Sequence, residues 1–403
     1  MPRRRDLSQV RGLSRIPLLS YAQKATDPNR PRRDEEAPPT FPTIAAFLPQ
    51  HLWKWLTTYL SKRLGPRHPF QTYRGADRGI HTLQGEGADV RIALVGDWGT
   101  GTDESFEVAQ QVDAFKPHYT IHLGDVYYVG DTPEVQENCL GKKLTEYDPC
   151  TWPWGSVGSF ALNGNHEMYA RGFGYFDTFL PTLGLKSGIR QQASFFCLEN
   201  EYWRIIALDT GYNCVGIPLL ENIPFWPFAP DCALPDELMT WLRLDVQPNR
   251  DDRGLVLLSH HQYFSSFEAG YTKPATQLRS VINRPVIWWW GHEHRMAVYD
   301  KQSVDGGIEA YGRCIGHGGM PVELSDKAVV PPLLFYDNQP YANDENLTIG
   351  RNGHANVTLT GNLMKVEYVD LKGQPVFAET WQTTNGVVTQ VSGAPATSSA
   401  GAR

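Results

Sequence analysis

Side chains of types that can bind metal ions follow five short apolar runs in this 403-residue chain. The runs end in Asp97, Asp125, Asn165-His166, His260-His261 and His292-Glu293-His294. A short apolar run is typical of a buried strand, and open α/β sheets hold their ligands at the carboxyl ends of strands. We therefore predict that the five strand ends meet at one composite metal site.

The residue types indicate what this site would do. Carboxylate, amide and imidazole ligands suit a pair of di- or trivalent first-row ions, whereas a structural zinc ion would take four Cys or His ligands. Two ions about 3.5 to 4 Å apart can clamp a phosphate and generate a hydroxide nucleophile near neutral pH. Such a reaction needs a bridging carboxylate and an imidazole outside the metal shell that donates a proton. We predict that Asp125 is the bridge and His166 is the proton donor.

The ordered set of motifs resembles that of the calcineurin-like metallophosphoesterases, and most closely that of the purple acid phosphatases. The motifs are Gly96-Asp97-Trp98-Gly99, Gly124-Asp125-Val126-Tyr127-Tyr128, Gly164-Asn165-His166-Glu167, Leu257-Leu258-Ser259-His260 and Gly291-His292-Glu293-His294. Two residues favour the purple subgroup. Gly99 stands where the wider superfamily usually has a metal-binding His, and Tyr128 lies three residues after the bridging Asp. The resemblance extends roughly from residue 90 to residue 380 and implies an α/β fold, the four-layer αββα sandwich.

The resemblance also implies a role for each motif residue. A ferric ion would be held by Asp97, Asp125, Tyr128 and His294. A second, divalent ion (Fe, Zn or Mn) would be held by Asp125, Asn165, His260 and His292. His166 would be the catalytic histidine outside the metal shell.

The chain departs from the family pattern at the second outer histidine. The family has such a residue about ten positions after the counterpart of His260, and this chain has no His there. We expect His261 or His317 to take the role, the latter within the turn Gly316-His317-Gly318-Gly319. A further departure, Leu257 in place of Val, is conservative.

The elements that must position these residues follow from the hydrophobic pattern. A strand ending at Asp97, a crossover helix over 103–115 and a strand ending at Asp125 form a βαβ unit. Further strands are predicted at 193–198, 203–208, 304–315 and 356–381, and helices at 173–183 and 235–246. Residues 131–158 read as loop, and the Pro-rich segment 211–235 is predicted to form a pocket wall because long loops in compact domains are usually functional.

Three regions are predicted along the chain. Residues 1–85 form a partly irregular N-terminal extension with a basic flexible arm and an amphipathic helix at 49–64. Residues 86–385 form the metallophosphoesterase domain, and residues 386–403 a disordered tail. Packing of the helix on the main domain is favoured over contact with a membrane or a partner.

The composition limits which partners and which cellular compartment are expected for this protein. A net charge of -7 argues against a nucleic-acid partner held by phosphate contacts, and no run reaches the roughly 20 apolar residues of a membrane span. The lack of a standard signal peptide predicts a cytoplasmic protein, with non-standard export left open. Reduced thiols are favoured for the six cysteines, although Cys139 with Cys150 and Cys214 with Cys232 could pair in an oxidising space.

Three functions fit the sequence. The leading one is hydrolysis of small phosphomonoesters by hydroxide generated at a dinuclear metal site. The second is hydrolysis of phosphodiesters such as cyclic nucleotides or phospholipid headgroups. The third, of another class, is a membrane- or partner-docking role through helix 49–64. The physiological substrate, the second metal and the oligomeric state are left open.

Overall fold

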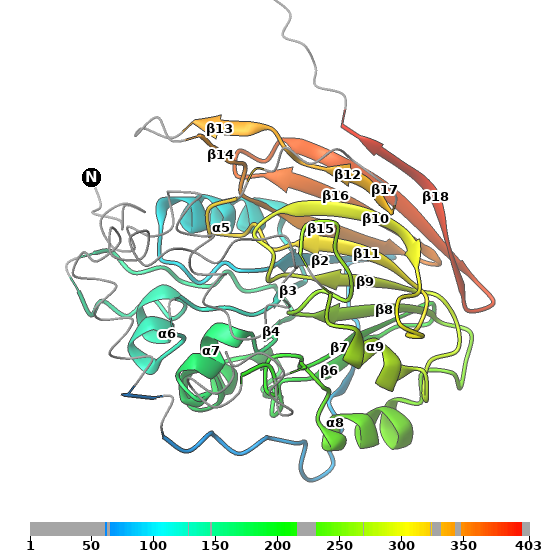
Figure 1. The fold of residues 1–403 in the computed structure, drawn as a ribbon, viewed down its shortest axis with the longest axis horizontal. Coiled ribbons are helices and arrows are strands. Elements are labelled where there is room, and N and C mark those ends of the chain that lie inside the picture. The colour runs from blue at the N-terminus through cyan, green and yellow to red at the C-terminus, as the bar shows by residue number, and fades with distance from the viewer. Residues whose placement is uncertain are drawn as a thin grey trace, which may run out of the picture.

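Two eight-stranded sheets form the centre of the molecule (Figure 1). The computed structural model describes residues 61–62, 65–127, 129–145, 147–215, 231–268, 270–322, 324, 332–342 and 348–396. The β8 sheet contains, in spatial order, β1 (Ile80–Thr82), β6 (Phe196–Glu199), β7 (Trp203–Ala207), β8 (Gly254–Ser259), β9 (Val286–Trp290), β11 (Ala310–Ile315), β10 (Met296–Gln302) and β12 (Leu333–Tyr336). The β2 sheet contains β18 (Val387–Pro395), β17 (Pro375–Thr384), β16 (Leu363–Asp370), β15 (Gly353–Thr360), β2 (Asp89–Val95), β3 (Tyr119–His122), β4 (Gly158–Ala161) and β5 (Gly184–Leu185). A separate pair joins β13 (Pro340–Ala342) and β14 (Thr348–Gly350).

The two sheets pack face to face, and alternate residues of each strand enter the core between them. On β2, Ile92 and Leu94 face this core, whereas Val95 faces the opposite way. On β9, Trp289 enters the same core while Trp288 and Trp290 pack on the outer face. This alternation follows from the two-residue period of a strand. The three consecutive tryptophans of β9 therefore pack on both of its faces.

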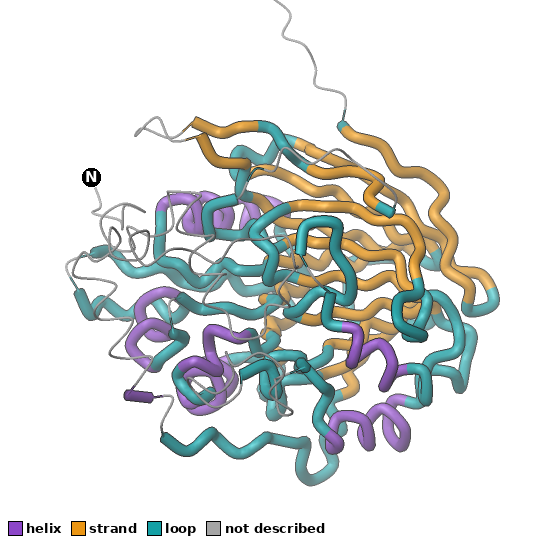
Figure 2. The backbone as a smooth tube through the Cα atoms, in the orientation of Figure 1, coloured by secondary structure: helices purple, strands orange, loops and turns teal. Residues whose placement is uncertain are grey.

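Helices cover both outer faces, which completes the four-layer αββα sandwich expected from the sequence (Figure 2). Helix α5 (Asp103–Phe115) packs on the β2 sheet, and its first turn is closed by a capping box between Thr102 and Ser105. The β8 sheet is covered by α8 (Asp236–Trp241), the π-helical turn η3 (Leu242–Val246) and α9 (Thr272–Leu278). The remaining helices are α6 (Thr132–Asn138), α7 (Asn165–Tyr169), η1 (Gly174–Phe179) and η2 (Leu180–Thr182).

A buried ion pair joins the two sheets. Arg313 on β11 donates two hydrogen bonds to the carboxylate of Glu379 on β17, at 2.8 and 2.7 Å. Both side chains are fully buried, and the hydroxyl of Tyr368 also donates to Glu379 at 2.8 Å. Because a buried charge without its partner is costly, this pair constrains how the sheets can face each other.

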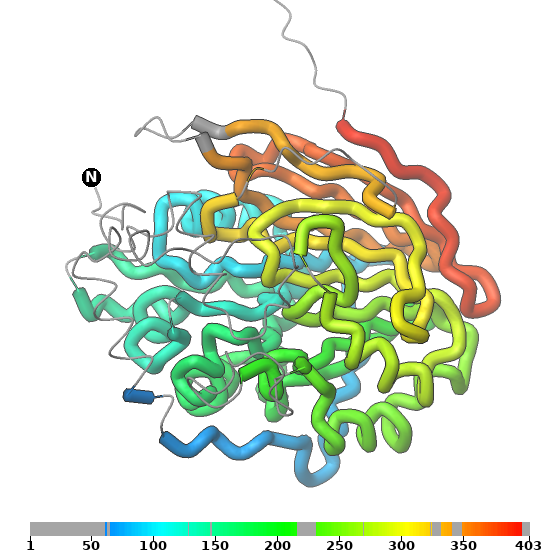
Figure 3. Tube along the Cα trace, in the orientation of Figure 1, coloured from blue at the N-terminus to red at the C-terminus, as the bar shows by residue number. Residues whose placement is uncertain are grey.

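Parallel pairing brings the predicted strand ends together. Strands β2, β3 and β4 are parallel neighbours in one sheet, and β7, β8 and β9 are parallel neighbours in the other. Strand β15, from late in the chain, lies beside β2 in antiparallel register (Figure 3). The carboxyl ends of the parallel strands therefore meet at one end of the sandwich.

Several boundaries differ from the sequence-based expectations. Strand β1, within the predicted extension 1–85, pairs with β6, and β18, within the predicted disordered tail 386–403, pairs with β17. Composition misled the second prediction, because Val388 is buried even though the surrounding residues are small and polar. Helix α6 lies within the predicted loop-rich segment 131–158. In the segment 304–315 the strand is β11 (Ala310–Ile315), because β10 already ends at Gln302.

Two predicted features lie largely outside the described residues. These are most of the amphipathic helix at 49–64 and residues 216–230 of the predicted pocket wall. Among the residues that the structure describes, none of the helices combines the length and apolar character needed to cross a bilayer.

His354, buried on β15, should make stability depend on pH. Burial lowers its pKa from 6.5 to about 3, and its Nε2 donates to Asn356 Oδ1 at 3.0 Å. Its folded pKa lies below the unfolded value, so its contribution is complete above pH 6.5 and is lost as the pH falls. We expect His354→Gln, which keeps a side-chain donor but does not titrate, to lose about 1.4 kcal/mol less per pH unit below 6.5. Urea unfolding at pH 7 and pH 5, in the same metal state, measures the difference; parallel pH dependences would contradict it.

Candidate metal centre

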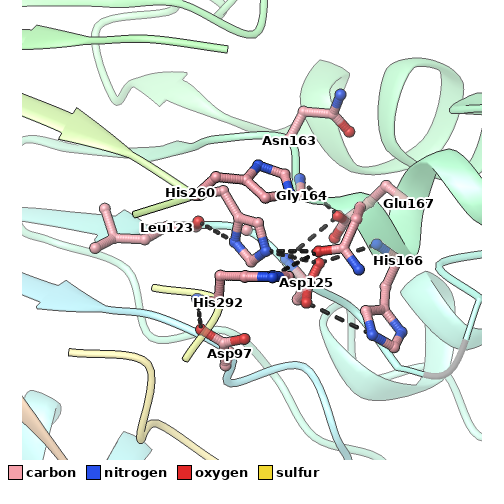
Figure 4. Close-up of polar contacts among 12 residues, drawn as sticks. Asp97, Leu123, Asp125, Asn163, Gly164, His166, Glu167, His260 and His292 are labelled. Atoms are coloured by element: carbon pink, nitrogen blue, oxygen red, sulfur yellow. Dashed lines mark hydrogen bonds and ion pairs between the residues drawn. The ribbon is translucent and has the colours of Figure 1, made fainter. Parts of the chain in front are cut away.

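The side chains predicted from the five motifs converge where the two sheets bring their strand ends together (Figure 4). Asp97 follows β2, Asp125 follows β3, and Asn165 begins α7 just after β4. His260 follows β8, and His292 and His294 lie between β9 and β10. All six side chains are buried.

A first donor cluster surrounds the hydroxyl of Tyr127. This oxygen lies 2.7 Å from Oδ1 of Asp97, 3.1 Å from Oδ2 of Asp125 and 3.1 Å from Nε2 of His294. Four side chains with oxygen or nitrogen donors thus point at one another within a water-excluded space. Such a group is able to hold a cation.

A second donor cluster surrounds the amide oxygen of Asn165. Its Oδ1 lies 2.9 Å from Nε2 of His260 and 3.0 Å from Nδ1 of His292. The other carboxylate oxygen of Asp125, Oδ1, lies 3.3 Å from the same His260 nitrogen. Asp125 therefore presents one oxygen to each cluster, as a bridging ligand must.

The backbone at the site adopts the left-handed conformation at three of the predicted ligands. The φ angles are 58° at Asp97, 74° at Asp125 and 64° at His292. This region is unfavourable for residues with a Cβ, and such strain is typically concentrated at functional sites. The turns after β2, β3 and β9 are thus strained in order to aim these side chains.

Two motif glycines leave room for the carboxylates. A Cβ at Gly164 would clash with Oδ1 of Asp125, and a Cβ at Gly291 would clash with Oδ2 of Asp97. The glycines that precede Asn165 and His292 are therefore required by the close approach of a carboxylate to the backbone.

Neighbouring groups orient the donors. Nδ1 of His260 donates to the carbonyl of Leu123 at 2.9 Å, so Nε2 is the nitrogen that faces the second donor cluster. The amide nitrogen of Asn165 donates to the hydroxyl of Tyr169 at 2.9 Å, so its oxygen faces the same cluster. The backbone N–H of His292 donates to Oδ2 of Asp97 at 2.8 Å.

The charges of the site reinforce one another. Burial opposes ionisation of Asp125, but the neighbouring His260 and His166 hold its pKa well below the usual value. Burial would lower the pKa of His260, yet Asp125 and Asp97 raise it to about 10. Burial and the same two carboxylates raise the pKa of Tyr127 well above its usual value, and a bound cation would reverse this tendency.

Glu167 stabilises the turn that carries Asp125. Its Oε2 accepts the backbone N–H groups of Gly164 at 2.8 Å and Asp125 at 3.2 Å. Burial and the charge of Asp125 raise the pKa of Glu167 to about 8. This carboxyl group links the turns after β3 and β4.

The three predicted catalytic histidines lie in different surroundings. His166 donates its backbone N–H to Oδ1 of Asp125 at 3.0 Å, and its Nε2 lies 3.7 Å from Oδ2. His261 lies beside His260 and His292, with ring centroids 4.8 and 4.6 Å away. His317 is buried and bonds the backbone of Ile315, and burial lowers its pKa to about 4.

The tyrosine that reaches the first donor cluster is Tyr127, whereas the sequence pointed to Tyr128, which lies outside the described residues. The sequence-based reasoning also gave no role to Thr210 or Tyr169, which contact His261 and Asn165. One signal for Thr210 was available, because Asp209 and Thr210 follow the apolar end of β7 just as the metal motifs follow their strands. His122 is a core residue: its Nδ1 accepts the N–H of Gly124, and its ring packs against Trp152.

A family model for calcineurin-like phosphoesterases matches residues 90–296, which is more than half of the chain. The chain belongs to this family. It is accordingly a metallophosphoesterase, an enzyme that hydrolyses phosphoric esters with the help of metal ions. No protein among the curated sequences matches it.

Three solved structures similar to this metallophosphoesterase are those of GAP50, a purple acid phosphatase and PhoD. GAP50, the anchor in the inner membrane complex of Plasmodium, is 14% identical with a TM-score of 0.48, covering 74% of this chain and 90% of that one. The purple acid phosphatase PPD1 from yellow lupin is 13% identical with a TM-score of 0.47, covering 73% and 54%. PhoD is 12% identical with a TM-score of 0.44, covering 77% and 73%. Because all three TM-scores are below 0.5, the family assignment rests on the family model.

The donor sets fit metal ions. Asp97, Asp125 and His260 offer ligand atoms that all lie within 4.8 Å of one another, and so do His260, His261 and His292. Carboxylate, phenol, amide and imidazole groups are the usual ligands of first-row transition metals in proteins. The phosphoesterase thus has candidate metal-ligand groups, as expected for a member of a metal-dependent family.

Asp125→Asn should remove metal from both clusters, because the amide has one acceptor oxygen and no negative charge to share between them. We expect the purified variant to hold markedly less metal than the wild type, as measured by inductively coupled plasma mass spectrometry. Asp337→Asn is the matched control, since Asp337 is equally buried but pairs with Arg351 outside the clusters. Full metal content in Asp125→Asn would show that Asp125 is not the bridge.

Proposed function

We propose that this metallophosphoesterase hydrolyses phosphomonoesters at a pair of metal ions, in the manner of the purple acid phosphatases. The observation that carries the proposal is the position of Asp125. Its two carboxylate oxygens face two different donor clusters, one built around Tyr127 and the other around Asn165.

The two clusters differ in chemistry, which supports unlike ions. The first combines two carboxylates, a phenol and one imidazole, and such hard anionic oxygens favour Fe(III). The second combines the shared carboxylate, an amide oxygen and imidazoles, which suit a divalent ion such as Zn, Fe or Mn. When bound, such ions polarise the phosphoryl group and supply a nucleophilic water near neutral pH.

His166 is the residue we assign to protonation of the leaving group. Its backbone is anchored on Asp125, and its ring packs against Tyr127 and Tyr169 with centroids 4.4 and 4.8 Å away. The imidazole is thus held next to the carboxylate of Asp125, with its Nε2 3.7 Å from Oδ2. A positioned imidazole there is able to transfer a proton to the departing alkoxide.

We further assign the phenolate ligand of the ferric ion to Tyr127. Its hydroxyl lies within 3.1 Å of three donors that share the first cluster, namely Asp97, Asp125 and His294. Such a phenolate would give an iron-loaded protein a visible charge-transfer band and a pink to violet colour.

Replacement of Tyr127 by Phe should bleach this colour and weaken iron retention, because the ring stays while the oxygen is lost. Tyr128→Phe is the matched control and should keep the band. The measurement is the visible spectrum of each iron-loaded protein together with its iron content. The reverse pattern would restore Tyr128 as the ligand, and a colourless wild type loaded with iron would place the enzyme outside the purple subgroup.

His166→Ala should retain metal while turnover falls roughly 100- to 10,000-fold, the range that a positioned proton donor supplies. Metal analysis and steady-state kinetics on the same preparation test this. His354→Gln, at a buried histidine that belongs to neither donor cluster, serves as the histidine control. Loss of metal from His166→Ala would instead make His166 a ligand.

The substrate class is tested by phosphate release from p-nitrophenyl phosphate and from bis(p-nitrophenyl) phosphate between pH 4 and 9. We expect faster turnover of the monoester and inhibition by chelators. Faster turnover of the diester would replace the proposed substrate class with phosphodiesters, and no hydrolysis of either ester by metal-loaded protein would contradict the proposal.

A further inference from the structure

His261 is a buried histidine of the site that the ligand set implied by the family leaves out. It lies directly after His260, and 1% of its surface is exposed. Its ring is perpendicular to that of His260, with centroids 4.8 Å apart, and lies 4.6 Å from the ring of His292. Both neighbours belong to the second donor cluster.

One nitrogen of His261, Nδ1, is hydrogen-bonded to Thr210, the residue that follows Asp209 after β7. The Thr210 hydroxyl oxygen lies 3.1 Å from Nδ1 of His261 and also accepts the backbone N–H of His261 at 3.0 Å. Both contacts are satisfied if Nδ1 carries the proton and donates it to this oxygen. The lone pair of the imidazole then resides on Nε2.

The other nitrogen, Nε2, is buried and has no hydrogen-bond partner among the described residues. Leaving a buried polar atom unpaired destabilises the fold, so such an atom calls for an explanation. A ligand bound to Nε2 would explain why this nitrogen is buried without a hydrogen-bond partner.

His261 also satisfies the geometry of a metal ligand. It forms one group with His260 and His292 in which the ligand atoms all lie within 4.8 Å of one another. Since zinc–nitrogen bonds are about 2.0 to 2.1 Å long, two nitrogens on one ion lie at most about 4.2 Å apart. The separations among the three imidazoles, at most 4.8 Å, are close to this limit.

We propose that His261 is a third imidazole ligand of the second ion, positioned by Thr210, and that it makes this site selective for zinc or ferrous iron over manganese. The inference rests on the two-metal centre of the proposed function. Imidazole favours zinc and iron, whereas manganese prefers carboxylate and water oxygens, so each added imidazole shifts the preference toward the former.

The test compares His261→Ala and Thr210→Val with the wild type in the full-length chain. Zinc and manganese affinities are measured by titration in metal buffers, and bound metal is counted by mass spectrometry. We expect Thr210→Val to weaken zinc binding at one of the two sites by about 10- to 100-fold, the usual effect of losing an outer hydrogen bond to a metal ligand. His261→Ala should weaken zinc binding further and manganese binding less.

X-ray absorption spectroscopy of zinc bound at the second site gives a readout independent of activity. The wild type should show three imidazoles on zinc, and His261→Gln should show two. Circular dichroism and thermal melting of the metal-free proteins show whether the variants fold. If the His261 variants do not fold, Thr210→Val still tests the proposal.

The outcomes separate this inference from the proposed function. Unchanged zinc affinity and imidazole count in the His261 variants, with two metals still bound, would overturn the role of His261 alone. Unchanged zinc affinity with weaker inhibition by inorganic phosphate would also overturn it, because His261 would then contact the phosphate. A wild type that never binds a second ion would instead overturn the two-metal centre itself.

Discussion

The rest of the site depends on the contacts that the buried carboxylate of Asp125 makes with both donor clusters. This carboxylate is only 1% exposed, and its two oxygens face different donor clusters. Such a group is costly to bury as an anion unless positive charge or hydrogen-bond donors surround it. The backbone N–H of His166 and the imidazole of His260 meet part of this need, and Glu167 ties down the backbone of Asp125 itself.

The sandwich supplies the rigidity that this arrangement requires. Asp97 and Asp125 come from one sheet, and His260 and His292 come from the other. The distances between the clusters therefore depend on how the sheets pack. The continuous apolar core between them and the buried pair of Arg313 with Glu379 restrict that packing. Side chains far from the site thus contribute to its geometry, because protein interiors are close-packed and transmit displacement.

A second layer of hydrogen bonds decides which atom each donor presents. Leu123 fixes the tautomer of His260, Tyr169 fixes the amide of Asn165, and Thr210 fixes the ring of His261. These partners come from separate segments, after β3, within α7 and after β7. A metal ligand is useful only if its lone pair faces the ion, so these contacts matter as much as the identity of the ligands.

The ordered motifs, through the family that they resemble, predicted the αββα fold, and they singled out Asp125 as the candidate bridge. They also named six candidate ligands: Asp97, Asp125, Asn165, His260, His292 and His294. They could do so because a strand end followed by a polar residue is a local pattern, and parallel strands must carry such ends to a common edge. The contact of the Tyr127 hydroxyl with the first donor cluster required the tertiary structure, since the backbone of the turn sets the direction of this side chain. The same holds for His261, whose neighbour Thr210 is distant in sequence. Strand β18 was also missed, because its pairing with β17 outweighs a local composition that is typical of a flexible tail.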